Sequence, residues 1–127
     1  MSDTSPQDLK LLVIDDDKII TDMIERVLVD SDVSVWSVND SKEIEQSYKE
    51  FGPDVIFLDL GLPGFEGTEV LSYLASLDCD SRISLISGLD RPSLETCQAV
   101  GVDFDLNIIG ALTKPFTRDD ILFAIAA

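Results

Sequence analysis

The sequence predicts an α/β fold: a single doubly wound parallel sheet of five strands covered by five helices. Four short, mostly apolar segments indicate strands that are buried on both faces, as in a parallel sheet. Segments with helical spacing of apolar residues separate them, so strands and helices alternate along the chain. The length of 127 residues fits one domain, which we expect over residues 9–127 after a polar tail at residues 1–8.

The strands are predicted from the apolar segments, each of which ends in a polar residue. A fifth segment, residues 33–38, is less uniformly apolar and is expected nearer an edge of the sheet. The connection at residues 101–110 is long, so it is expected to carry an extra turn or a lengthened approach to the last strand. The predicted strands are Leu9–Ile14, Val33–Val38, Val55–Leu58, Ile83–Ile86 and Ile108–Leu112.

The helices are predicted from capping residues, chain breakers and one-sided apolar stripes. Trp36 and the apolar stripes, including Leu122 in the last helix, are assigned to packing. The first helix follows Asp17, the second runs from a capping box at Asp40 and Glu43 to Gly52, the third follows Gly67, the fourth runs from Pro92 to Gly101, and the fifth follows the cap formed by Thr117 and Asp120.

The charge balance and the absence of histidine exclude several classes of function. A net charge of −16 makes the surface repel nucleic acid and anionic lipid, so we expect no direct nucleic acid binding. Without histidine the chain cannot carry serine–histidine hydrolysis, histidine metal ligands or a histidine phosphodonor. Cys79 and Cys97 lack CxxC spacing and are assigned to packing rather than to a zinc site.

The sequence shows no targeting or membrane segment. Residues 1–10 lack the basic start and the apolar stretch of a secretory signal. No apolar run approaches the length of about 20 residues needed to cross a bilayer. We therefore expect a cytoplasmic protein with no membrane partner.

Polar residues at the strand ends predict a site, because ligands of such sheets bind beyond the carboxyl ends of the strands. Asp15, Asp16 and Asp59 are expected to meet there, beside Ser87 and Lys114. At about 4 Å and an effective dielectric constant near 20, one like-charge pair costs roughly 4 kcal/mol, so positive charge is needed. Lys114 supplies one positive charge, and a divalent cation would supply the rest. A set of oxygen ligands without histidine or thiolate favours Mg²⁺ as that cation. Such a site suits phosphoryl transfer to a carboxylate.

Each of these segments also has a simpler interpretation. The aspartates at 15–17 could cap the first helix, and Asp59 could form a turn with Gly61, Pro63 and Gly64. The dipeptides at 87–88 and 114–115 could be a plain turn and a plain strand terminator. Their joint occurrence at four strand ends favours the site, and Asp17 alone is assigned to capping.

Four motifs together resemble the receiver domain of two-component response regulators, the CheY-like group of flavodoxin-like folds. They are LLVIDDD, DVIFLDLGLPGFEG, ISLISG and LTKPF, in this order and spacing. The resemblance runs from Leu9 to the C-terminus, and four motifs in register make it specific. It implies the strand order 2-1-3-4-5.

The resemblance also implies the roles of the acidic residues. Asp59 would be the phosphoacceptor, receiving a phosphoryl group from a phosphohistidine of a sensor histidine kinase or phosphotransfer protein. Asp15 and Asp16 match the acidic pair that organises Mg²⁺, with Asp59 and the main-chain carbonyl of Gly61 completing the protein ligands.

The same resemblance implies a switch. Lys114 matches the lysine that contacts the phosphoryl oxygens, and its bond to Pro115 would be cis. Ser87 matches the hydroxyl residue that moves towards the phosphate. In the family this movement rearranges the surface of the fourth helix, fifth strand and fifth helix, where downstream partners dock.

Three features depart from the family pattern. Ala111 stands where an aromatic residue usually swings inward, so an aromatic switch cannot operate there. Gly61 has no side chain to contact the hydrolytic water, which affects the lifetime of the phosphoaspartate. The third feature is the long connection at residues 101–110.

Two other functions stay open at this point. One is a phosphorylation-independent receiver that acts as a protein-interaction module. The other is an aspartate-nucleophile phosphatase, although position 61 is glycine where the dehalogenase type has a second aspartate. The sequence also suggests how the signal leaves the domain. The segment LNIIGALTKPF resembles the corresponding segment of receivers that are joined to cyclic-di-GMP phosphodiesterase domains, so a C-terminal effector of that kind is one expectation. A stand-alone receiver that docks on an effector protein is another, and a homodimer through the fourth and fifth helices is a family expectation.

Overall fold

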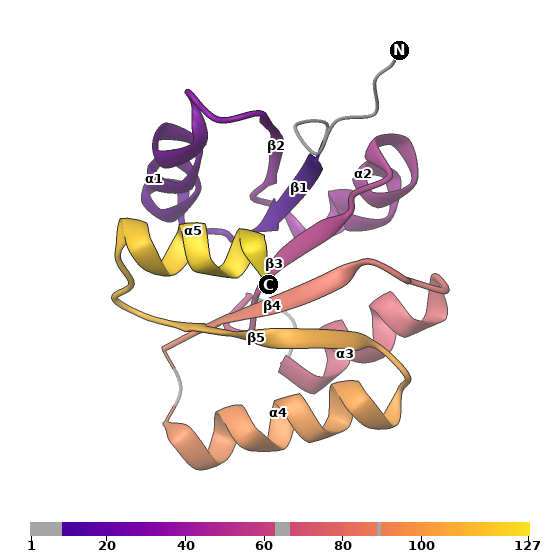
Figure 1. Ribbon diagram of the computed structural model, residues 1–127. Helices are drawn as coiled ribbons and strands as arrows, with labels where there is room; N and C mark the ends of the chain where they lie inside the picture. Colours follow the sequence, from indigo (N-terminus) through magenta and orange to yellow (C-terminus); the bar gives the residue numbers. More distant parts are fainter. Residues whose placement is uncertain (1–8, 63–66, 89) are drawn as a thin grey trace.

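The computed structural model describes residues 9–62, 67–88 and 90–127, which form one parallel sheet with helices on both faces (Figure 1). The strand order is β2-β1-β3-β4-β5, which confirms the predicted fold class and order. The strands are β1 Leu9–Ile14, β2 Val33–Val38, β3 Val55–Asp59, β4 Arg82–Ser87 and β5 Asn107–Thr113. The helices are α1 Lys18–Leu28, α2 Ile44–Phe51, α3 Gly67–Ser76, α4 Arg91–Asp103 and α5 Arg118–Ala126, with a 3₁₀ turn, η2, at Ser41–Glu43.

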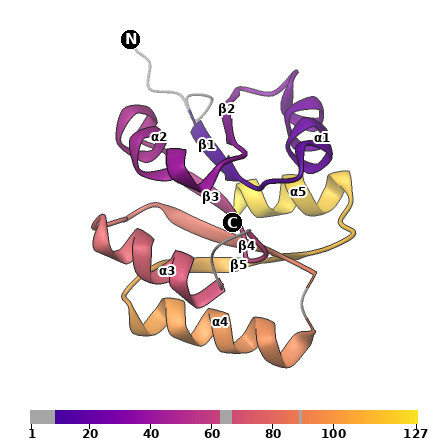
Figure 2. The ribbon, with the colours of Figure 1, turned by 180° about the vertical axis from the view of Figure 1, so that it is seen from behind.

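The sheet separates two apolar layers. Leu11 and Val13 of β1 pack in the layer beneath α1 and α5, whereas Leu12 and Ile14 pack in the layer beneath α2, α3 and α4. This alternation follows from the period of two along a strand. Figures 1 and 2 show α1 and α5 on one side of the sheet and the other three helices on the opposite side. Because both faces are covered, all five residues of β3 are buried.

Side-chain caps begin most of the helices. Asp17 accepts a hydrogen bond from the Ile19 N–H, and Thr117 and Asp120 form the predicted capping box of α5. Among the described contacts, the Asp40 carboxylate accepts from Lys42 and begins η2, instead of forming the predicted box with Glu43. The second helix therefore starts one turn later than predicted, at Ile44.

Gly101 does not end the fourth helix, which continues to Asp103. Gly101 is buried, and a Cβ atom there would lie 2.8 Å from Cγ1 of Ile108. The glycine therefore lets α4 approach β5 closely. The prediction was wrong because glycine ends helices and also permits close packing, and sequence alone does not distinguish the two uses.

The long connection is accommodated partly by this helix and partly by a β-bulge. Between α4 and β5 only residues 104–106 remain, with Asp105 in the left-handed region at φ 62°. Ile83 pairs with Ile108 but Ser84 pairs with Gly110, so Ile109 is one extra residue in β5. The expected lengthened approach to the last strand is thus a bulge within it.

Two apolar residues are less buried than expected. Leu122 is 38% exposed, because the buried face of α5 consists of Ile121 and Ala124. Trp36 on edge strand β2 is also 38% exposed and packs its ring edge-on against Phe51. Both cysteines are buried and free, as predicted.

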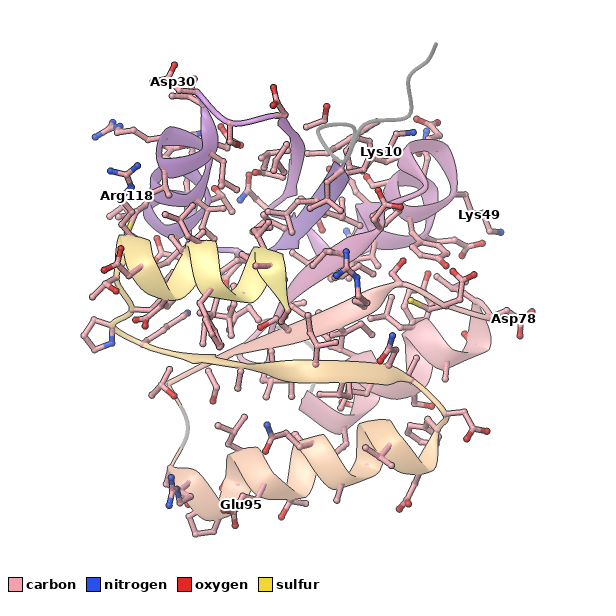
Figure 3. All side chains as sticks on the ribbon, in the orientation of Figure 1. Lys10, Asp30, Lys49, Asp78, Glu95 and Arg118 are labelled. Atoms are coloured by element: carbon pink, nitrogen blue, oxygen red, sulfur yellow. The ribbon has the colours of Figure 1, made fainter. Side chains whose placement is uncertain are left out.

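The charged surface surrounds this core. Figure 3 shows the labelled side chains Lys10, Asp30, Lys49, Asp78, Glu95 and Arg118 at the periphery of the molecule, and all six are exposed. Within the described residues, no helix combines the length and apolar character needed to cross a membrane. The predicted tail at residues 1–8 and the turn residues Pro63 and Gly64 lie outside the described residues.

Candidate functional site

The parallel sheet brings the polar strand ends to one edge. Asp59 ends β3 and pairs with Ile86, while Ser87 ends β4 and pairs with Thr113. The Lys114 amide donates to the Ser87 carbonyl at 2.8 Å, which joins the end of β4 to the residue after β5. The Lys114–Pro115 peptide is cis, as the resemblance implies.

Three carboxylates meet at this edge. One oxygen each from Asp15, Asp16 and Asp59 lies within 4.8 Å of the others. Asp15 and Asp59 are buried, whereas Asp16 is exposed. Asp15 and Asp16 follow β1, and Asp59 ends the adjacent strand β3, so the sheet register holds the three carboxylates together.

Lys114 is the cation beside this cluster. Its Nζ lies 3.6 Å from Oδ2 of Asp15 and 3.6 Å from Oδ1 of Asp59. One ammonium group against three carboxylates leaves two negative charges unbalanced when all are ionised. The site therefore has the charge and the oxygen atoms to bind a divalent cation.

Asp15 is a fully buried carboxylate of the site. Burial, reinforced by the neighbouring Asp59 charge, raises its pKa to about 6, although the Asp17 amide and Lys114 act in the opposite direction. Its Oδ1 accepts from the Asp17 N–H at 2.8 Å. Its Oδ2 is buried without a hydrogen-bond partner among the described residues. An unsatisfied buried carboxylate oxygen fits the role of a Mg²⁺ ligand, because a cation would supply the missing interaction.

Asp59 is held by the turn that follows it. The Gly61 N–H donates to Oδ1 of Asp59 at 3.0 Å, and a Cβ at position 61 would lie 3.5 Å from that oxygen. The hydrogen bond fixes the orientation of the carboxylate and leaves its second oxygen for other interactions.

Ser87 and Ala111 lie on the two strands beyond β3: Ser87 on the adjacent β4, and Ala111 on the outer strand β5. Ser87 is buried at the last position of β4. Ala111 lies in β5 and, together with Lys114 and the exposed Phe123 of α5, lines a groove of about 510 Å³ between β5 and α5. The groove thus begins at the site lysine and runs along the outer strand.

One residue near the site was not predicted. Asn39 directly follows β2, and its side-chain amide donates to the main-chain carbonyl of Asp15 at 2.8 Å. Its position was the available signal, because every other strand also ends beside a polar residue of the site. The type of residue gave no indication, since a hydrogen bond to a main-chain carbonyl requires only a side-chain donor, which many polar residues supply.

Comparisons with known proteins agree with this geometry. The protein-family model named response regulator receiver domain matches residues 11–126 of this chain. The chemotaxis protein CheY of Bacillus subtilis is 29% identical over 120 residues, covering 91% of this chain and 93% of that protein. The C4-dicarboxylate transport transcriptional regulatory protein DctD of Pseudomonas aeruginosa is 28% identical over 127 residues, which cover 98% of this chain but 26% of that protein. A solved signal receiver domain from Bermanella marisrubri is 28% identical, with a TM-score of 0.77 and coverage of 92% and 94% of the two chains.

Proposed function

Because this chain belongs to the receiver-domain family of response regulators, we propose that it accepts a phosphoryl group on Asp59 and passes the signal to a partner. The donor is a phosphohistidine of a sensor kinase or phosphotransfer protein, and the transfer takes place in the cytoplasm. One observation carries the proposal: Lys114 Nζ lies 3.6 Å from both buried carboxylates, Asp15 and Asp59, at the carboxyl edge of the sheet.

Asp15, Asp16, Asp59 and the main-chain carbonyl of Gly61 are the residues we propose to hold Mg²⁺. The buried, unsatisfied Oδ2 of Asp15 supports this assignment. When bound, the cation supplies positive charge that balances the carboxylates and the phosphoryl oxygens.

In the proposed reaction, the Asp59 oxygen that is not bonded to Gly61 attacks the phosphorus atom. The P–O bond to aspartate forms as the P–N bond to histidine breaks, and the electron pair leaves with the imidazole of the donor. The Gly61 N–H holds the carboxylate in place, and Lys114 stabilises the negative charge of the phosphoryl oxygens. The protein is therefore a phosphorylated signalling domain rather than an enzyme with a separate substrate.

The response is proposed to reach the surface through Ser87 and Lys114. Ser87 ends β4 shortly before α4, and its carbonyl accepts from the Lys114 amide. Movement of the Ser87 hydroxyl towards a phosphoryl group would therefore act on the links to α4 and from β5. The groove between β5 and α5, with Phe123 79% exposed beside it, supports docking of an effector domain or protein at this face.

Beryllofluoride, a stand-in for the phosphoryl group, tests this function in the presence of Mg²⁺. We expect wild type to bind it, with changes in amide chemical shifts around Asp59 and Lys114, and Asp59→Asn to lose binding. Asp30→Asn is the matched control, because Asp30 is an exposed aspartate outside the site. Binding by Asp59→Asn at wild-type affinity would contradict the proposal.

The remaining outcomes separate the alternatives. Absence of binding in the wild type would favour a phosphorylation-independent interaction module. Multiple turnovers of a phosphate ester would favour an aspartate-nucleophile phosphatase.

A further inference from the structure

Asn39 is an exposed residue that bonds to the turn between β1 and α1. Its Nδ2 donates to the carbonyl of Asp15 at 2.8 Å and lies 3.4 Å from Oγ1 of Thr21 in α1. The Asp15 N–H in turn donates to the carbonyl of Val38, the last residue of β2. The end of β2 therefore holds the peptide groups on both sides of Asp15.

The hydrogen bond from Asn39 also fixes the orientation of the peptide group that leads into Asp16. The carbonyl of Asp15 and the amide of Asp16 share one planar peptide group, so fixing the carbonyl fixes the plane from which Asp16 extends. Among the described residues, no backbone amide donates to that carbonyl. No hydrogen bond of the described residues holds the exposed Asp16 carboxylate, so its position depends on its backbone.

Thr21 supports this arrangement from the helix. Its buried hydroxyl donates to the carbonyl of Lys18 at 3.1 Å and can accept from Asn39 with its free lone pair. Asn39 thus bridges the acidic turn and the first turn of α1. The bridge leaves the carboxylates of Asp15 and Asp16 directed into the cluster with Asp59.

We propose that Asn39 is a positioning residue for the acidic pair, holding the Asp15–Asp16 peptide in the orientation that binds a divalent cation. This inference rests on the proposed function, because it assigns Asn39 a role at the same Mg²⁺ site. Asn39 touches neither the cation nor the phosphoryl group in this role and acts through the main chain of Asp15.

Calorimetric titration with Mg²⁺ alone tests the proposal on wild type, Asn39→Ala and Asn107→Ala. Asn107, the other asparagine, begins β5 at the opposite edge of the sheet and is the matched control. Residues that orient metal ligands typically change affinity by 10-fold or more, so we expect Asn39→Ala to raise the Kd for Mg²⁺ about tenfold. Asn107→Ala should retain the wild-type Kd.

Urea unfolding without Mg²⁺ distinguishes positioning from a structural role. Because Asn39 is exposed, we expect Asn39→Ala to fold, with shifted amide signals confined to Asp15, Asp16 and their neighbours. An unchanged Kd, with or without a loss of stability, overturns the inference, and so does equal weakening by Asn107→Ala. Absence of Mg²⁺ binding in the wild type overturns the proposed function as well, whereas equal affinities of wild type and Asn39→Ala overturn only the role of Asn39.

Discussion

Asp15 shows how the site uses a buried charge. Its side chain is fully buried, and one of its oxygens has no hydrogen-bond partner among the described residues. An ionised carboxylate in this position is costly unless a cation lies beside it. Lys114 provides part of that compensation at 3.6 Å, and the cluster of carboxylates leaves the remainder to a ligand.

The raised pKa of Asp15 predicts how stability depends on pH without divalent cations. Between the ordinary value of 3.8 and about 6, the folded protein holds a proton that the unfolded chain has released. The free energy of unfolding therefore falls as pH rises through this window. From about pH 4 to about pH 7, urea titrations should show the wild type losing about 2 to 3 kcal/mol more than Asp15→Asn. Parallel pH profiles of the two proteins would contradict the assignment.

Lys114 is expected to couple phosphorylation to the response. Lys114→Ala should fold and accept a phosphoryl group on Asp59 from a small-molecule donor, because the nucleophile is unchanged. It should lose the amide shift changes in α4, β5 and α5, since no ammonium group then links Asp59 to the residue after β5. Lys18→Ala is the control, as Lys18 is an exposed lysine of α1 paired with Asp22. A normal structural response in phosphorylated Lys114→Ala would refute this coupling.

At the scale of elements, regular patterns were predicted well and particular contacts were not. The bounds of β1 and β2 agree with the prediction because short segments rich in apolar and β-branched residues mark strands regardless of their neighbours. The prediction that Asp15, Asp59 and Lys114 lie close together is confirmed, because parallel strands end at a common edge of the sheet. The role of Gly101 was predicted wrongly, because it depends on close packing against Ile108 of β5. Asn39 was missed, because its role depends on the carbonyl of Asp15, which is distant in sequence.

The end of α2 gives a prediction about backbone conformation. Gly52 caps this helix at φ 61°, in the left-handed region, and a Cβ there would meet no atom within 4 Å. Gly52→Ala should therefore cost about 1 to 2 kcal/mol through conformation alone, and Gly52→Asn should cost less. Gly110→Ala is the control because it also has open space but no positive φ, so denaturation should show little loss. Equal stabilities of Gly52→Ala and Gly110→Ala would contradict this explanation.

For the whole molecule, the net charge of −16 means that cations can stabilise the fold in two ways. They can screen the repulsion between surface charges, or they can bind at a specific site, and a test of the site must separate these two effects. Any salt weakens the repulsion between surface carboxylates and stabilises the folded state. Under the proposed function, a cation held by Asp15, Asp16 and Asp59 would add a second effect, because folding brings these three carboxylates together.

A comparison of two salts separates these effects. At equal ionic strength, Mg²⁺ should raise the thermal midpoint more than Na⁺, because ligand at about 100 times its Kd adds about 2.7 kcal/mol of stability. Scanning calorimetry should show the extra increment reduced in Asp59→Asn and retained in Asp30→Asn. Identical midpoints in the two salts would exclude a specific site.

The irregularity in β5 determines where the molecule tolerates a change in chain length. Ile109 is an unmatched residue between two stretches that are each in regular register with β4. Its deletion would join these stretches into one continuous ladder and leave Thr113 opposite Ser87. A deletion between Gly110 and Thr113 would instead draw Lys114 along the strand by one step of about 3.3 Å, away from its carboxylates. Removing Ile109 is therefore compatible with the geometry of the site, whereas removing a residue of β5 after the bulge damages it.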